Sequence, residues 1–171
     1  MATPRVAALV PAAGRGERLG PGTPKALRLL GDVPLLVHAV AALTAARLVD
    51  VVVVAAPAGE LDAVRGLLGR SVRVVAGGAT RTASVRAALA TLEPAVEAVV
   101  VHDAARPLAP SSLVDEVVAA VLAGAPAVVP AVPVIDTIKR VDVRGQVVET
   151  VPREELRAVQ TPQGFRRAVL D

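Results

Sequence analysis

The chain has 171 residues, 53% of them hydrophobic and 20% charged, which is sufficient for one folded domain and excludes a disordered segment. Aromatic residues make up only 1% of the chain, too few for the stacking platforms of a single-stranded nucleic-acid binder. The net charge is +3 with scattered arginines, and cysteine is absent, so we expect no nucleic-acid partner, and disulfides, thiolate catalysis and cysteine zinc sites are excluded.

The start of the chain, MATPRVAALVP, does not resemble a signal peptide, because its short apolar stretch runs into a loop rich in glycine and arginine. Residues 117–135 carry no charge, but they contain Gly124, Pro126, Pro130 and Pro133. That pattern indicates a helix end, a turn and a buried strand rather than a membrane span. We therefore expect a cytoplasmic protein with no membrane partner.

Short apolar runs alternate with helical patterns along the chain. Strands are predicted at Val6–Val10, Val49–Ala55, Val72–Val75, Ala98–Val101 and Ala127–Val132. Helices are predicted at Pro34–Ala46, Glu60–Leu68, Thr82–Leu92 and, after a serine cap, Ser111–Leu122. Repeated strand–helix units predict an α/β fold with three layers, in which helices cover both faces of a mostly parallel, Rossmann-like sheet.

A β-hairpin is predicted near the end of the chain. Ile138–Val141 and Val147–Thr150 flank a loop containing Gly145. We expect this hairpin to project as an arm, about residues 137–155, from a single domain spanning residues 1–171.

In a parallel sheet, ligands bind at the carboxyl ends of the strands. The loops that follow Val10, Val75, Val101 and Val132 are therefore the candidate positions for a site, and each contains polar or glycine-rich sequence.

The loop after the first strand reads PAAGRGERLGPGTPK, with a G-x-G-x-x-x-G spacing that is neither the dinucleotide fingerprint nor the P-loop. Arg15, Arg18 and Lys25 lie in it, opposed only by Glu17. Glycine backbone and cationic side chains together favour an anion such as phosphate. The alternative is a solvated glycine–proline loop with incidental charges.

Five motifs in this order carry a resemblance to a known family. They are PAAGRGERLGPGTPK, GGATRTASV, VHDAARP, DTIKR and VQTPQGF. The first resembles the loop of nucleotidyltransferases, and the set resembles the 2-C-methyl-D-erythritol 4-phosphate cytidylyltransferase family of the non-mevalonate isoprenoid pathway over nearly the whole chain. The resemblance implies transfer of a cytidylyl group from CTP to a polyol phosphate, with Mg²⁺ as cofactor and pyrophosphate as product. The attacking phosphate is already ionised, so catalysis rests on positioning and charge neutralisation.

The resemblance also assigns residues. It implies that Arg18 and Lys25 hold the triphosphate and that Arg153 is donated by the neighbouring subunit of a homodimer formed through the arm. The implied nucleotide-binding set is Pro11, Ala12, Ala13, Gly14, Gly16, Gly78, Ala79, Ser84, Asp103 and Ala104. The implied substrate contacts are Asp103, Arg106, Thr137 and Thr161, and Asp103 is the implied metal ligand.

Several of these residues have a second interpretation. Ser84 fits a cytosine contact or a helix-surface serine, and Asp103 fits a ribose or Mg²⁺ ligand or a turn aspartate. Arg106 either binds the polyol phosphate or pairs with Asp103, and Thr161 is a secondary contact or a dimer-loop residue. His102 is expected to be a buried, hydrogen-bonded imidazole rather than an acid–base group.

Two departures from the family pattern matter. Ala79 stands where some relatives carry an acidic side chain, and the chain stops at Asp171 where relatives continue with an acidic loop and a further lysine, so we expect the C-terminal part of the family domain to be missing. The rival interpretations are a ribitol-5-phosphate or other polyol or sugar-phosphate nucleotidyltransferase, or a non-catalytic nucleotide-binding module, with the hairpin as a monomeric ribbon.

Overall fold

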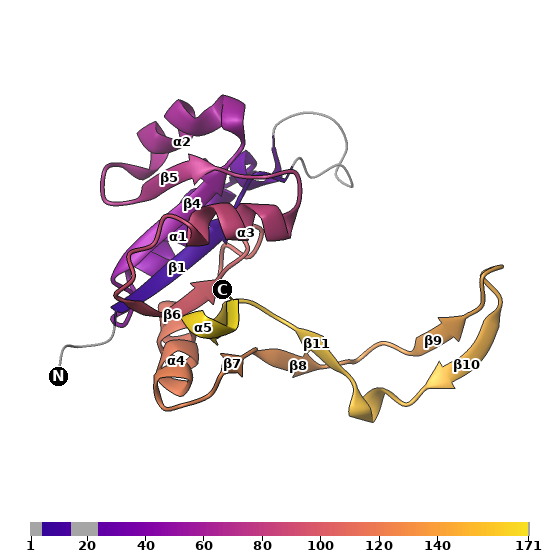
Figure 1. Ribbon diagram of the computed structural model, residues 1–171. Helices are drawn as coiled ribbons and strands as arrows, with labels where there is room; N and C mark the ends of the chain where they lie inside the picture. The colour runs from indigo at the N-terminus through magenta and orange to yellow at the C-terminus, as the bar shows by residue number, and fades with distance from the viewer. Residues whose placement is uncertain (1–4, 15–23, 171) are drawn as a thin grey trace.

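The computed structural model describes residues 5–14 and 24–170. Its body is a six-stranded sheet in the order β5-β4-β1-β6-β12-β7 (Figure 1). Four neighbouring strands are parallel, namely β1 (Arg5–Pro11), β4 (Val51–Ala56), β5 (Arg73–Ala76) and β6 (Val96–Val101). The antiparallel strand β12 (Gln163–Arg166) lies between β6 and β7 (Ala127–Val128).

The unbroken apolar sequence of β1 follows from burial on both faces of the sheet. Val6, Ala8 and Val10 face one core cluster, and Ala7 and Leu9 face another. The first cluster is closed by α1 (Leu35–Thr44), α2 (Leu61–Leu68) and α4 (Ser111–Leu122), and the second by α3 (Arg81–Leu89) with α5 (Arg167–Leu170). The predicted three-layer, mostly parallel architecture is confirmed.

The strand predicted at Ala127–Val132 is wrong as a single strand. It is divided into β7 and β8 (Ala131–Pro133), and β8 pairs with β11 (Arg157–Val159) outside the main sheet. Pro130 stands between β7 and β8 and lacks the backbone N–H that a continuous ladder needs. The loop after Val132 therefore leads away toward the arm (Figure 1), and its predicted place at the carboxyl edge of the sheet is wrong.

Strand β12 is not among the predicted strands. Its residue Gly164 lies directly beneath α4, where a Cβ would approach Val117 Cγ1 to 2.6 Å. At the start of α4 the expected serine cap is also wrong, because the residue at the N-cap is Pro110 and it makes no side-chain cap.

The predicted hairpin is confirmed as β9 (Ile138–Val141) paired antiparallel with β10 (Val147–Val151). Asp142 Oδ1 closes the turn by accepting hydrogen bonds from the backbone N–H groups of Arg144 (2.8 Å) and Gln146 (2.9 Å). Gly145 there has φ +79°, a conformation that costs glycine little. The hairpin projects well away from the sheet body (Figure 1).

Short elements complete the chain. They are the 3₁₀ turns η2 (Lys25–Leu27), η3 (Ala58–Glu60) and η4 (Arg153–Glu155) and the paired strands β2 (Leu29–Leu30) and β3 (Val33–Pro34). Within residues 5–14 and 24–170, none of the helices has the length and apolar character needed to span a membrane.

Candidate functional site

A cavity of about 290 Å³ lies at the carboxyl ends of β1, β5 and β6. Its walls include every described member of the predicted nucleotide-binding set together with Lys25, which is predicted to hold the triphosphate in catalysis. These residues are Pro11, Ala12, Ala13, Gly14, Lys25, Gly78, Ala79, Ser84, Asp103 and Ala104. Four residues outside that prediction also line it: Ala26, Thr80, Arg81 and Ala105. Three of the four predicted loops thus meet at one place.

Backbone hydrogen bonds extend the sheet ladder into these loops. The N–H of Ala12 donates to the carbonyl of Ala55 (2.8 Å), that of Gly77 to Ala56 (2.8 Å), and that of His102 to Leu9 (2.9 Å). The first residues past each strand are therefore held by the rigid sheet, which is the usual way that an α/β fold positions a site.

The loop after β5 is packed against its neighbours. A Cβ on Gly77 would lie 2.4 Å from Ala13 Cβ, and one on Gly78 would lie 2.4 Å from Ala83 Cβ. Only glycine permits this approach without a shift of the chain. The close packing brings the walls formed by β1 and β5 together at the cavity.

Ser84 fixes the shape of the same loop. Only 2% of the residue is exposed, so the helix-surface interpretation is wrong. Its Oγ accepts from Gly78 N–H (3.1 Å) and lies within hydrogen-bond distance of the carbonyls of Thr80 (3.0 Å) and Gly78 (3.3 Å). Ser84 lines the cavity and at the same time satisfies the loop backbone; a cytosine contact stays a prediction.

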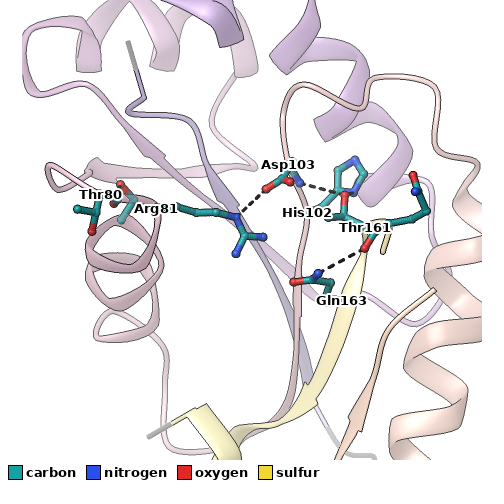
Figure 2. A network of polar contacts seen from close by, with 8 residues as sticks. Thr80, Arg81, His102, Asp103, Thr161 and Gln163 are labelled. Atoms are coloured by element: carbon teal, nitrogen blue, oxygen red, sulfur yellow. Dashed lines mark hydrogen bonds and ion pairs between the residues drawn. The ribbon is translucent and has the colours of Figure 1, made fainter. Parts of the chain in front are cut away.

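Asp103 is held from two sides. Arg81 Nε donates to Asp103 Oδ1 at 2.9 Å (Figure 2), and the backbone N–H of Asp103 donates to Thr161 Oγ1 at 3.3 Å. Arg81 was not predicted as a site residue, although it stands within the GGATRTASV motif. The expected alternative pairing of Asp103 with Arg106 is wrong, because the Arg106 guanidinium instead donates to the side chain of Gln160.

His102 is buried behind Asp103, as expected from the sequence. Its Nε2 lies 3.1 Å from the carbonyl of Arg106, and its Nδ1 lies 3.0 Å from Thr161 Oγ1. Burial lowers the pKa of His102, which favours the neutral ring. Because a carbonyl only accepts, Nε2 carries the proton and Nδ1 accepts from the Thr161 hydroxyl. The hydroxyl in turn accepts from Asp103 N–H, so Thr161 links buried His102 to the backbone of the loop after β6.

Arg106 and Thr161, two of the predicted substrate contacts, are not among the residues that line this cavity. Two other predicted residues lie farther away, on the arm. Thr137 and Arg153 line a separate hollow of about 200 Å³ on the arm, and Arg153 Nη1 donates to the carbonyl of Ile135 at 2.5 Å. Within one chain the structure does not bring them to the cavity at the sheet. Gly16 and Arg18 lie outside the described residues.

The donor set bears on the expected magnesium ion. The described part of the chain holds no group of three or more histidine, cysteine or acidic side chains arranged for a metal. Asp103 is the one carboxylate among the described residues lining the cavity, and Arg81 already engages one of its oxygens. Mg²⁺ commonly binds through one or two carboxylates plus phosphate oxygens. This set fits a magnesium ion that arrives with a nucleotide.

Two further hollows differ in their relation to the site. One of about 410 Å³, which includes Pro57 and Ala58, shares Ala13, Gly14, Gly78 and Ala79 with the first cavity. A larger one, about 580 Å³, lies against the opposite, amino end of β6 and contains none of the predicted residues. We take the cavity of about 290 Å³ at the carboxyl ends of β1, β5 and β6 as the site, because ligands bind at the carboxyl ends of parallel strands.

Comparison with known proteins adds a separate line of support. Residues 6–171 match the family described as IspD, 2-C-methyl-D-erythritol 4-phosphate cytidylyltransferase. Curated proteins of that name from Frankia casuarinae and Streptomyces coelicolor are 64% and 54% identical, over 99% and 97% of this chain. The chain spans 64% and 66% of the lengths of those two relatives.

Solved structures agree in fold. A crystal structure of 2-C-methyl-D-erythritol 4-phosphate cytidylyltransferase from Thermus thermophilus is 37% identical, with a TM-score of 0.77 over 96% of this chain and 72% of that one. A 4-diphosphocytidyl-2C-methyl-D-erythritol synthase from Anaerococcus prevotii is 27% identical, with a TM-score of 0.83 over 96% of this chain and 71% of that one.

Proposed function

The chain belongs to the 2-C-methyl-D-erythritol 4-phosphate cytidylyltransferase family, and from that premise we propose that it transfers the cytidylyl group of CTP to 2-C-methyl-D-erythritol 4-phosphate. The products are 4-diphosphocytidyl-2-C-methyl-D-erythritol and pyrophosphate. The observation that carries the proposal is the single cavity lined by Lys25, Gly78, Asp103 and their neighbours from three strand ends.

The reaction needs charge neutralisation more than acid–base chemistry. A phosphate oxygen of the acceptor forms a bond to the α-phosphorus of CTP while the bond from that phosphorus to the pyrophosphate oxygen breaks. Lys25, with Arg18, neutralises the charge that grows on the leaving pyrophosphate. His102 takes no part in proton transfer, because both of its ring nitrogens are engaged by Arg106 and Thr161.

Small side chains and backbone groups form the part of the proposed site that would bind the nucleotide. Ala12, Ala13 and Gly78 allow the ligand to approach the main chain, and Ala79 leaves base recognition to backbone groups. Asp103 would hold Mg²⁺ together with phosphate oxygens of the nucleotide. The ion, when bound, neutralises phosphate charge.

The arm belongs to the same proposal. Val141, Val143, Val147 and Val148 are all more than half exposed on the hairpin and its turn, and apolar side chains exposed together mark a contact surface. We infer a homodimer in which the arm carries Arg153 to the partner's acceptor phosphate, near Thr137. A cytoplasmic location is part of this proposal, because both substrates are charged, water-soluble phosphates.

Pyrophosphate release tests the proposed function. The purified chain is incubated with Mg²⁺, CTP and either 2-C-methyl-D-erythritol 4-phosphate or ribitol 5-phosphate, and then with ATP, GTP or UTP in place of CTP. We expect release with CTP and the methylerythritol phosphate. Faster pyrophosphate release with ribitol 5-phosphate would identify that compound, rather than the methylerythritol phosphate, as the acceptor. Binding of CTP without pyrophosphate release, whichever acceptor is present, would identify a non-catalytic nucleotide-binding module.

A further inference from the structure

Arg81 is a cationic side chain that lines the cavity and has no role in the reaction proposed above. It is the first residue of α3 and follows Thr80, whose side chain caps the helix by accepting from Ala83 N–H at 3.1 Å. The Arg81 backbone is therefore fixed at the wall formed after β5, while its guanidinium crosses to the wall formed after β6 (Figure 2).

The partner of Arg81 is fixed on the other side. The Asp103 backbone donates to Thr161 Oγ1, and Thr161 is itself hydrogen-bonded to buried His102. With its main chain anchored in this way, the Asp103 carboxylate retains mainly its side-chain torsions. Arg81 Nε restricts those torsions by binding Oδ1. Among the described residues, Oδ2 has no hydrogen-bond partner, so it remains available to a ligand.

The pair is placed for binding rather than for stability. The side chains of Arg81 and Asp103 are 49% and 35% exposed, and ion pairs at that exposure contribute little to folding. Both residues line the cavity. A carboxylate beside a polyanionic ligand would otherwise repel it and turn away, and an adjacent guanidinium offsets that charge.

We propose that Arg81 is a positioning residue for the nucleotidyl transfer: its guanidinium joins the two walls of the cavity and holds the Asp103 carboxylate with Oδ2 directed to the bound ligand. The inference rests on the proposed function, because Asp103 needs a fixed orientation only if it contacts nucleotide, metal or acceptor. Arg81 acts through Asp103 and makes no separate contribution to the reacting atoms.

A double-mutant cycle on the full chain tests this dependence. The variants are Arg81→Gln, Asp103→Asn and the double variant, each measured for kcat, for the KM of CTP and of the acceptor, and for CTP affinity without acceptor. Each single change should lower kcat/KM about tenfold or more, whereas the double variant should lie within about threefold of Asp103→Asn, because contacting residues are not additive. The matched control Arg86→Gln removes the same charge from the same helix outside the cavity and should stay within about twofold of wild type.

Two further measurements distinguish a positioning role of Arg81 from a role in folding stability alone. The unfolding midpoint of Arg81→Gln should stay within about 2 °C of wild type, and Arg81→Lys should recover part of the lost kcat/KM by restoring the charge. The KM that rises in both single variants identifies the ligand that Asp103 contacts.

The failures are distinguishable. If wild type turns over but the double variant loses about 100-fold, the product of two independent tenfold losses, this inference is overturned and the proposed function stands. The same conclusion follows if Arg86→Gln loses as much activity as Arg81→Gln. If wild type neither binds CTP nor releases pyrophosphate, both are overturned.

Discussion

The walls of the cavity and the arm represent opposite ways of holding a functional side chain. Asp103 and Ser84 are fixed within one chain, by hydrogen bonds to Arg81, Thr161 and the loop backbone. Arg153 and Thr137 instead lie on an extended ribbon with little core of its own. A two-stranded hairpin alone is marginally stable in water. Under the proposed function, the described residues predicted to bind the nucleotide are positioned within one chain, whereas Arg153 and Thr137 would reach the acceptor only through a partner subunit.

Removing the amino group of Lys25, which lines the cavity, should have the largest effect. In Lys25→Ala the charge on the leaving pyrophosphate loses one of its two proposed neutralising cations, so we expect kcat to fall by about 100-fold or more. Because η2 is a short turn at the cavity wall, the unfolding midpoint should change little. Steady-state kinetics and a thermal melt check this. A rate equal to that of wild type would remove Lys25 from the mechanism.

Removing the Arg153 guanidinium from the arm should lower turnover without changing the affinity for CTP. For Arg153→Ala we expect kcat to fall about tenfold to 100-fold while CTP affinity stays within about twofold. The matched control is Arg144→Ala at the tip of the arm, which should change neither. Calorimetry with CTP and pyrophosphate release provide the two readouts. Equal loss of binding and turnover in Arg153→Ala would place it on the nucleotide side instead.

The close packing behind the cavity gives a third test. Gly77→Ala places a Cβ 2.4 Å from Ala13 Cβ and 3.2 Å from the carbonyl of Ala55, so the loop must shift. We expect a loss of about 1–3 kcal/mol in the free energy of unfolding and weaker CTP binding. Gly59→Ala, which meets nothing within 4 Å, is the control. Urea unfolding and calorimetry distinguish the two; the same result for both would show that the close approach is unimportant.

The smallest effect concerns pH. Burial lowers the pKa of His102 below its ordinary value of 6.5, so between 6.5 and the lowered pKa the unfolded chain binds a proton that the folded chain does not. The free energy of unfolding should therefore fall as the pH falls through this window. The fall measured by urea unfolding between about pH 7.5 and pH 5.5 should be smaller in His102→Gln. An identical pH dependence would contradict the buried, neutral ring.

The sequence predicted the body of the fold because its signals are local. Strand β1 and its parallel neighbours are mostly apolar runs that the sequence shows directly. Because these strands are parallel, the loops that follow them lie at the same, carboxyl edge of the sheet. Strand β12 gave no such signal, since its sequence QGFR has one large apolar residue and its position depends on packing beneath α4. The division into β7 and β8 follows from pairing with β11, a partner distant in sequence.

The site was predictable to the level of loops but not of contacts. The motifs identified Asp103, Gly78 and Ser84 as neighbours, yet Arg81 was missed, because a helix-start arginine is ordinary until the fold brings it to Asp103. The pairing of Arg106 was also misjudged. Its partner Gln160 lies 54 residues along the chain, and no spacing rule links the two.

The most direct test of the account is a crystal structure of the full chain with CTP and Mg²⁺ bound. We expect the triphosphate within hydrogen-bond distance of Lys25 Nζ and the base against the Gly78–Ala79 backbone. Nucleotide bound elsewhere, with Lys25 directed away from it into solvent, would contradict the account.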